Sequence, residues 1–85
     1  MDEEGLEYSP HARKKMSNGG IFEEDVEGTV DWPTRRQRSF YGRIKHFGYS
    51  SDGRLINVVT DRTERYVITV IDLMKRPRNR GRRRK

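Results

Sequence analysis

The sequence predicts an α+β domain with two N-terminal helices packed on one face of a three- to four-stranded antiparallel β-meander. Two observations predict this class. Helix start and stop signals occur only in the first 33 residues, and β-branched runs separated by short turns fill residues 40–74. Short connections favour antiparallel hairpins, because parallel strands need a long crossover. A chain of 85 residues holds one domain at most, with a small core.

The two helices are predicted from their ends. Ser9 suits the N-cap position and Pro10 the first helical position, where its missing N–H costs nothing. This helix should end at Asn18-Gly19-Gly20. A second helix is expected over 22–31, with acidic residues in its first turn and Pro33 beyond its end. The residues expected to be buried on the two helices are Ala12, Met16, Ile21, Phe22, Val26 and Val30.

Three strands are expected after a basic loop at Thr34–Arg38. They span about Phe40–Tyr49, Arg54–Asp61 and Tyr66–Met74, and the sheet has room for an extra edge strand from either terminus. The third strand is the longest run of β-branched and apolar residues in the chain. Because it is apolar on both faces, it is expected near the middle of the sheet.

The strand register follows if both turns are simple hairpin loops, so that residue 49 pairs with 54 and residue 61 with 65. The helices should then cover the face formed by Phe40, Ile44, Leu55, Val59, Val67, Ile71 and Leu73. The same register places His46, Asn57 and Thr69 in one row on that face. We interpret this row as partnered polar groups in the core or at its rim.

The other predicted face is aromatic and basic, with an apolar centre of Ile56, Val58, Ile68 and Val70. Such a strand surface suits base stacking and phosphate binding. Two other interpretations stay open: the aromatic residues are simply strand formers, or the apolar centre is a dimer surface. The residues expected on this face are Tyr41, Arg43, Lys45, Phe47, Tyr49, Arg54, Thr60 and Tyr66.

Charge divides the chain into three parts, although the net charge is only +6. Residues 1–8 carry four acids and form an expected flexible lead-in, and residues 9–74 form the single domain. Residues 75–85 carry eight Lys or Arg and no acid, and are expected to be a disordered tail that binds phosphate by counterion release. A solubilising extension or an arm for an acidic partner would also fit. The tail residues taken as nucleic-acid contacts, beside Tyr41, Lys45, Tyr49 and Tyr66, are Lys75, Arg76, Arg78 and Arg80.

Several protein classes are excluded or disfavoured by composition. There is no cysteine, which excludes disulfides and thiolate metal sites. No apolar run approaches the roughly 20 residues of a membrane span, and no signal-peptide pattern opens the chain. The expectation is a cytoplasmic protein with no membrane partner. His11 and His46 are the only histidines and have no carboxylate spaced with them on one element, so neither a metal nor a cofactor is expected.

The segment Ser9–Met16 (SPHARKKM) resembles the opening S-x-H-A-x-x-[RK]-M of a family of small bacterial and archaeal proteins. The similarity continues through Gly20-Ile21, Val26, Trp32-Pro33 and Thr69-Val70, and covers roughly residues 8–74. That family is similar to the BrnT and RelE toxins of toxin–antitoxin systems, within the barnase, EndoU, colicin and RelE nuclease-like fold.

The resemblance implies a metal-independent ribonuclease in which the RNA 2′-hydroxyl attacks the adjacent phosphate. Such chemistry needs a proton acceptor or donor and cations for the developing charge. His11 matches the family's helix histidine and Lys15 a basic position, while Arg43 is the residue chosen to stabilise the transition state. Thr69 also matches a family position, but the predicted register buries it. Gly19 stands where the family often has a basic residue, which fits either weakened catalysis or a position that has no role in catalysis.

Three functions therefore remain for the sequence. The first is an RNA-cleaving, toxin-like enzyme that uses His11, Lys15 and Arg43. The second is a protein that binds RNA or other nucleic acid without a reaction, through the basic tail and the aromatic, basic sheet face. The third is an interaction module for an acidic partner such as an antitoxin. The sequence does not specify the oligomeric state.

Overall fold

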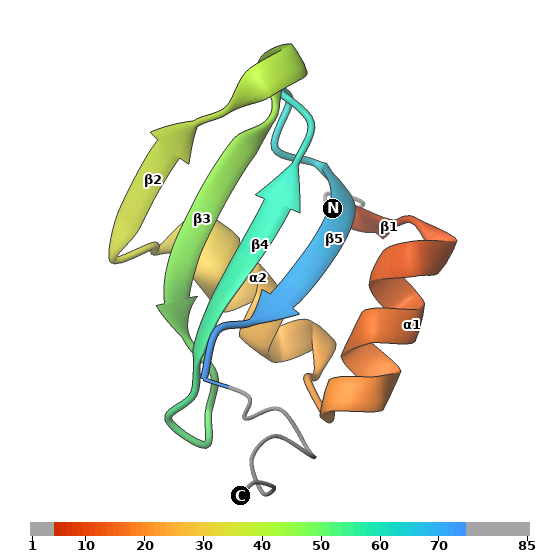
Figure 1. Cartoon of the computed structure of the whole chain (residues 1–85), viewed down its shortest axis with the longest axis vertical. Coiled ribbons are helices and arrows are strands. Elements are labelled where there is room, and N and C mark those ends of the chain that lie inside the picture. Colours follow the sequence, from red (N-terminus) through yellow and green to blue (C-terminus); the bar gives the residue numbers. More distant parts are fainter. Residues whose placement is uncertain (1–4, 75–85) are drawn as a thin grey trace, which may run out of the picture.

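The computed structural model describes residues 5–74, which form two helices and a five-stranded sheet and confirm the α+β class (Figure 1). Four tail residues predicted to contact nucleic acid lie outside the described residues: Lys75, Arg76, Arg78 and Arg80. Residues 1–4 lie outside them as well. The elements in chain order are β1 (Glu7–Tyr8), α1 (Pro10–Gly19), α2 (Glu23–Asp31), β2 (Arg35–Arg38), the 3-10 turn η1 (Phe40–Gly42), β3 (Ile44–Tyr49), β4 (Leu55–Thr60) and β5 (Tyr66–Asp72).

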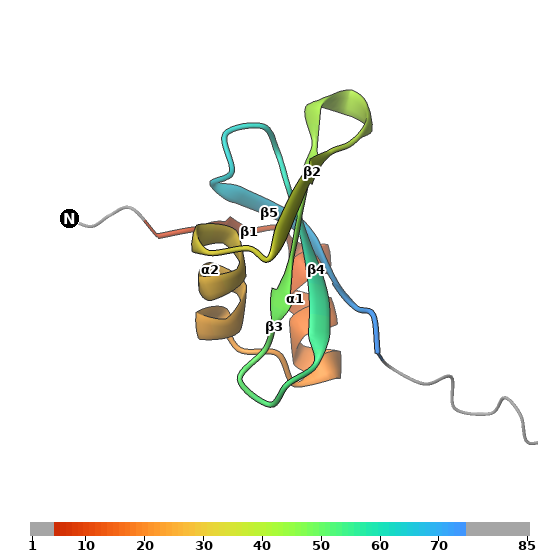
Figure 2. The ribbon, with the colours of Figure 1, turned by 90° about the vertical axis from the view of Figure 1, so that its left-hand side faces the viewer.

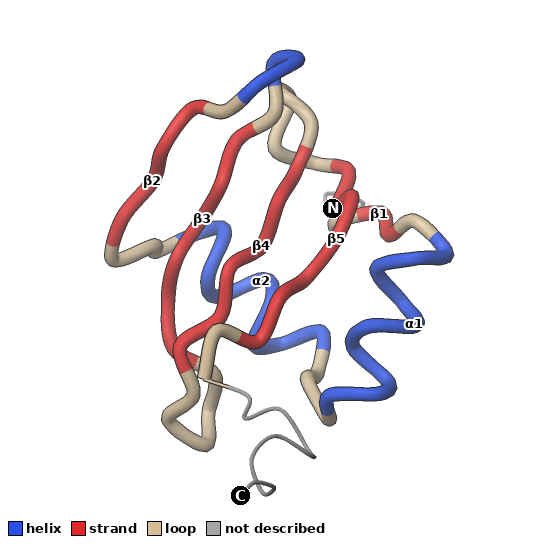
Figure 3. Tube along the Cα trace, viewed as in Figure 1, coloured by secondary structure: helices blue, strands red, loops and turns tan. Residues whose placement is uncertain are grey.

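The sheet is mixed and has the strand order β1-β5-β4-β3-β2, with β4 in the middle (Figure 3). The meander β3-β4-β5 is antiparallel as predicted, and each edge carries one further strand. β1 is an edge strand from the N-terminus, for which the prediction left room, whereas β2 was not predicted. β2 pairs antiparallel with β3, whereas residues 34–38 were expected to form a loop. All four β2 side chains are exposed, so this strand has no hydrophobic alternation from which it could have been predicted. Phe40–Gly42 is a 3-10 turn instead of the start of a strand.

The other edge strand comes from the expected lead-in. Glu7 and Tyr8 pair parallel with Tyr66 and Val67 of β5, so these two residues belong to the sheet. Ser9 then connects this strand to the first helix. Its Oγ accepts a hydrogen bond from the Ala12 N–H at 2.9 Å and donates one to the Ile68 carbonyl at 2.7 Å. The N-cap thus positions α1 against β5.

The helix ends are confirmed. Gly20 closes α1 in the left-handed conformation with φ +67°, which glycine adopts without strain. In α2 the Asp25 carboxylate accepts hydrogen bonds from the Phe22 N–H at 3.1 Å and from the Ser51 N–H at 2.9 Å, so it caps the helix and ties it to the β3–β4 turn. Ile21 and Val26 are buried as predicted. Phe22 is exposed, since it is the N-cap and precedes the buried stripe.

The two hairpin registers differ from the prediction. Tyr49 pairs with Leu55 rather than with residue 54, because the β3–β4 turn is one residue longer than assumed. Between β4 and β5 the register shifts at Val59 and Thr60, which pair with Thr69 and Val67. Ile68 is therefore the extra residue of a β-bulge.

These shifts change which strand residues face the helices. The predicted faces of β3 are correct. The predicted faces of β4 are reversed, and so are those of β5 after the bulge. His46 lies on the helix side, whereas Asn57 and Thr69 lie on the other side and in different rows, so the predicted polar row does not form. The helix side consists of Ile44, His46, Gly48, Ile56, Val58, Thr60, Val67 and Val70. The side without helices, the open face, consists of Arg35, Gln37, Lys45, Phe47, Tyr49, Leu55, Asn57, Val59, Thr69 and Ile71.

The core lies between the helices and the sheet. α1 packs on β5 and β1, and α2 packs on β3 and β4. Ile56 and Val58 are fully buried there, so these two residues are not available as a dimer surface. Gly48 permits the close approach of α2, since a Cβ at this position would lie 3.1 Å from the Thr29 Oγ1.

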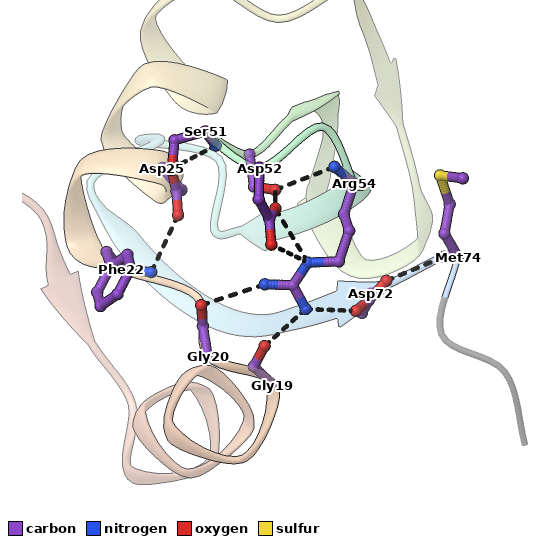
Figure 4. Close-up of polar contacts among 10 residues, drawn as sticks. Gly19, Gly20, Phe22, Asp25, Ser51, Asp52, Arg54, Asp72 and Met74 are labelled. Carbon is purple, nitrogen blue, oxygen red and sulfur yellow. Dashed lines mark hydrogen bonds and ion pairs between the residues drawn. The ribbon is translucent and has the colours of Figure 1, made fainter. Parts of the chain in front are cut away.

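Arg54 joins three parts of the fold at the end of the sheet opposite to η1 (Figure 4). Its guanidinium donates to the Gly19 carbonyl at 2.6 Å and the Gly20 carbonyl at 3.1 Å, at the C-terminus of α1. It also binds Asp52 and Asp72, each at 2.9 Å. The prediction placed Arg54 on the basic sheet face, but its charge is used within the fold.

Replacing Arg54 with alanine is expected to lower the free energy of unfolding by about 2 kcal/mol, because it leaves helix carbonyls and the half-buried Asp72 without their charged donor. Urea unfolding at pH 7 measures the change. Lys14→Ala, on the exposed side of α1, is the control and should change the free energy of unfolding by less than about 0.5 kcal/mol. Equal stability of the two variants would contradict the structural role of Arg54.

Candidate nucleic-acid interface

A pocket of about 440 Å³ lies where the β2–β3 connection meets the β4–β5 turn. We call it the arginine pocket, because four of the eight residues that line it are arginines. One carboxylate lies among them, so the lining carries a net charge of +3 (four guanidinium groups less one carboxylate). The lining residues are Arg36, Arg38, Ser39, Gly42, Arg43, Ile44, Arg62 and Glu64.

Only one of the four guanidinium groups is neutralised within the pocket. Arg36 binds Glu64 with two parallel hydrogen bonds, one of them from Nε to Oε1 at 2.9 Å. Among residues 5–74, Arg38, Arg43 and Arg62 have no ion-pair partner. The Arg43 guanidinium lies 5.9 Å from the centre of the Tyr41 ring. Three cations without an ion-pair partner thus line one open pocket.

A buried histidine, His46, contacts the carboxylate of Glu64. His46 is 0% exposed, with Nε2 3.0 Å from Glu64 Oε1 and Nδ1 3.1 Å from the Val58 carbonyl. The hydrogen bond from Arg36, with a further one from His46, outweighs the effect of burial and lowers the pKa of Glu64 to about 2. Glu64 is therefore a carboxylate at neutral pH. Since both imidazole nitrogens face acceptors, both contacts are hydrogen bonds only when each nitrogen carries a proton.

The backbone around the pocket is strained at two positions. Among residues 5–74, Tyr41 at φ 62° and Glu64 at φ 64° are the only non-glycine residues with positive φ. The left-handed conformation costs an ordinary residue roughly 1–2 kcal/mol, and such strain concentrates at functional sites. In this protein the strained backbone at Glu64 positions the pocket carboxylate, and the strained backbone at Tyr41 positions the tip of η1.

The tip of η1 presents two aromatic rings to solvent. Phe40 and Tyr41 are 80% and 93% exposed, and their ring centres lie 6.5 Å apart. Both residues directly precede Gly42 and Arg43 of the pocket. Aromatic surface therefore lies next to unpaired cations, the combination that single-stranded nucleic acid requires.

The structure does not bring the residues proposed for catalysis together. His11 and Lys15 are exposed on α1, which packs at the β1–β5 edge of the sheet, whereas Arg43 lies in the arginine pocket beside β2 at the other edge. Of the predicted binding residues, Tyr41 lies at the tip of η1, and Lys45 and Tyr49 lie on the open face. Tyr66 begins β5 at the β1 edge and is partly exposed.

Sequence reasoning missed Phe40, Arg36, Arg38, Arg62 and Glu64 as site residues. The available signal was charge: residues 32–51 contain five basic residues and no acid. The sequence predicts a loop and the start of a strand for these residues. It does not predict the ion pair between Arg36 and Glu64.

Within residues 5–74, no group of three His, Cys, Asp or Glu side chains could hold a metal ion. None of the helices described is long and apolar enough to cross a membrane. Comparison of the chain with models of protein families, with curated proteins and with solved structures gives no match. Fold and site define a small α+β protein with an arginine-lined pocket.

The low pKa of Glu64 predicts acid sensitivity. Its pKa of about 2 in the folded chain lies below the ordinary value of 4.5, so the ionised carboxylate stabilises the fold above pH 4.5 and this stabilisation is lost as the pH falls towards 2. We expect Glu64 to contribute at most about 3 kcal/mol to the decrease in unfolding free energy between pH 5 and 2.

Urea unfolding at pH 7, 5 and 3 tests this expectation. Glu64→Gln should be less stable than the wild type at pH 7 and lose less stability on acidification. The exposed Glu24→Gln should follow the wild-type curve. A Glu64→Gln variant with the full wild-type pH dependence would show that other groups determine the acid sensitivity.

Proposed function

We propose that this protein binds single-stranded nucleic acid, RNA in particular, through phosphate groups held in the arginine pocket, and that it does so without a catalytic step. The observation that supports this most strongly is the set of three unpaired guanidinium groups lining one pocket, beside the exposed rings of Phe40 and Tyr41.

The chemistry of the lining fits a phosphodiester. A guanidinium group binds a phosphate through two parallel hydrogen bonds, and each neutralised phosphate releases counterions, which makes binding sensitive to salt. Stacking on the two rings needs bases with a free face, which single strands and loops offer and paired helices do not. The ligand class is therefore an unpaired strand.

The distribution of charge agrees with a polyanionic ligand. The basic residues of 32–51 lie on β2, the β2–β3 connection and β3. The α2 helix carries five acids and no base, and it packs on the opposite side of the sheet from the open face. A nucleic acid is attracted to the first region and repelled by the second.

Metal-independent RNA cleavage is a second candidate, favoured by the single carboxylate among the guanidinium groups and by the resemblance to toxin-like nucleases. Glu64 would accept the 2′-hydroxyl proton while the arginines stabilise the phosphorane. A carboxylate with a pKa of about 2 is a weak base, and this one is already held by Arg36 and His46. Binding without cleavage is therefore preferred.

Incubation of a labelled mixed-sequence RNA with the full chain in EDTA, with binding and cleavage followed together, tests both candidates. We expect saturable, salt-sensitive binding and intact RNA. Products with 2′,3′-cyclic phosphate ends that disappear in Glu64→Gln would establish a ribonuclease at the arginine pocket. Loss of these products in His11→Ala would instead place the reaction on α1. Absence of RNA binding at low salt would overturn the proposed function.

A further inference from the structure

The open face of the sheet is not covered by a helix. α2 lies against the opposite side (Figure 2), and the Gly48–Thr29 approach identifies that side as the one the helix packs on. On the open face Tyr49 is 60% exposed and Ile71 is 37% exposed. Within the described chain, this face contains aromatic, aliphatic and basic residues but no acid. Its character is that of a surface for an anionic ligand with apolar parts.

Asn57 lies at the centre of this face, on the middle strand β4 between Phe47 and Ile71. It is 5% exposed, its Oδ1 is buried, and its carboxamide makes no hydrogen bond within residues 5–74. A buried amide without a hydrogen-bond partner destabilises the fold, whereas an apolar side chain of the same shape carries no such penalty. Within residues 5–74 the fold therefore gains no hydrogen bond from an asparagine here, and the amide is free to pair with a ligand.

The surroundings of Asn57 define that partner. Phe47 and Tyr49 provide ring surfaces on the neighbouring strand, and the Arg35 guanidinium lies 6.0 Å from the centre of the Phe47 ring. Lys45 adds a second cation two residues along β3. Rings for stacking, cations for phosphate and a free amide are together the elements of base recognition on an open sheet.

We infer that the open face holds an unpaired nucleobase, stacked on Tyr49 and Phe47 and read by the Asn57 carboxamide. A carboxamide donates and accepts in parallel, and it matches the N6 and N7 groups on the major-groove edge of adenine with two hydrogen bonds, whereas uracil offers only O4 on that edge. Because Asn57 is only 5% exposed in the unbound protein, its neighbours on the face, Phe47 and Ile71, have to move for the base to reach the amide. The inference rests on the proposed nucleic-acid binding but adds a second contact surface and a base preference.

A second copy of the chain is the other candidate for this face. The charges argue against it, because face-to-face pairing would bring the Arg35 and Lys45 residues of two copies together with no acid on either face to pair with them. A nucleic acid supplies the missing negative charge along its whole length. The size of the protein in solution decides between the two.

The test compares Asn57→Leu with the wild type, because leucine has the same branching of side-chain heavy atoms and no polar atom. Affinities for oligo(A) and oligo(U) of equal length are measured by fluorescence anisotropy on the full chain. The wild type should prefer oligo(A) by roughly tenfold, and Asn57→Leu should lose this preference while it binds oligo(U) as before. The variant should also melt at the same or a higher temperature, since the unsatisfied amide is gone.

Tyr49→Ala should weaken the binding of both oligomers by on the order of tenfold through lost stacking. Trp32→Ala is the matched control, because Trp32 is an exposed aromatic residue at the end of α2, and its removal should leave binding unchanged. Equal losses in the two variants would contradict the placement of the base on the open face.

The remaining outcomes distinguish failure of this inference from failure of the proposed function. Wild-type binding without a base preference, or a preference that persists in Asn57→Leu, overturns the inference and leaves the proposed function intact. No binding of either oligomer overturns both. A wild-type dimer in sedimentation that Tyr49→Ala makes monomeric identifies the open face as a contact between copies and also overturns the inference.

Discussion

Replacing His46 with alanine is expected to lower the free energy of unfolding by about 3 kcal/mol. The ring is fully buried between the sheet and the β4–β5 turn, so its removal leaves a cavity. It also removes the side-chain contact to the Val58 carbonyl and one of the hydrogen-bond partners of the Glu64 carboxylate, which keeps Arg36. Urea unfolding at pH 7 measures the loss, and the pKa of Glu64 should move back towards its ordinary range.

The matched control for this prediction is His11→Ala. His11 is exposed on α1, so its replacement should change the free energy of unfolding by less than about 0.5 kcal/mol. A second variant, His46→Gln, keeps an amide donor and should be less destabilised than His46→Ala. If both histidine-to-alanine variants unfolded at the same urea concentration, the His46–Glu64 contact would not support the pocket.

The largest functional effect is expected from the double variant Arg38→Gln/Arg62→Gln. Both guanidinium groups line the arginine pocket and neither has an ion-pair partner among residues 5–74, so folding should be unaffected while RNA affinity falls between roughly 10- and 100-fold. The plot of log affinity against log salt should become shallower by about 1.4, which corresponds to two phosphate contacts of a single strand.

Lys14→Gln/Lys15→Gln removes the same charge from α1 and serves as the control. General electrostatic attraction would weaken both double variants equally, whereas a defined pocket weakens only the first. A larger loss in the α1 variant would contradict the assignment and would favour the helix surface that the resemblance to toxin-like nucleases implies.

Local signals predicted the helices correctly. Ser9-Pro10 before α1, Gly20 after it and the acidic first turn of α2 all act within a few residues. Their physical basis is the satisfaction of backbone groups at helix ends, which does not depend on the rest of the fold. The α+β class followed from these signals and from the strand runs after them.

The strand faces could not be predicted in the same way. In β4 both alternating sets contain apolar residues: Leu55 and Val59 on one side, Ile56 and Val58 on the other. Such a strand can be placed in either register, and one additional turn residue reverses its faces. The bulge at Ile68 has no signal in the sequence, because Ile68 and its neighbours Val67 and Thr69 are all β-branched strand formers.

The arginine pocket depends on contacts between distant residues. Arg36 and Glu64 are separated by 28 positions, and His46 and Glu64 by 18. No spacing rule connects them, because β2 consists of exposed charged residues and resembles a loop. The run of basic residues could be read from the sequence, but neither its contact with Glu64 nor the pocket that it lines could.

The most direct measurement of the central claim is an NMR titration of the isotope-labelled full chain with a short single-stranded RNA. We expect the largest changes in amide chemical shift at residues 36–44 and 61–64, around the arginine pocket, and only small changes along α1. Changes centred on His11 and Lys15, with the pocket unaffected, would contradict the assignment of nucleic-acid binding to the arginine pocket.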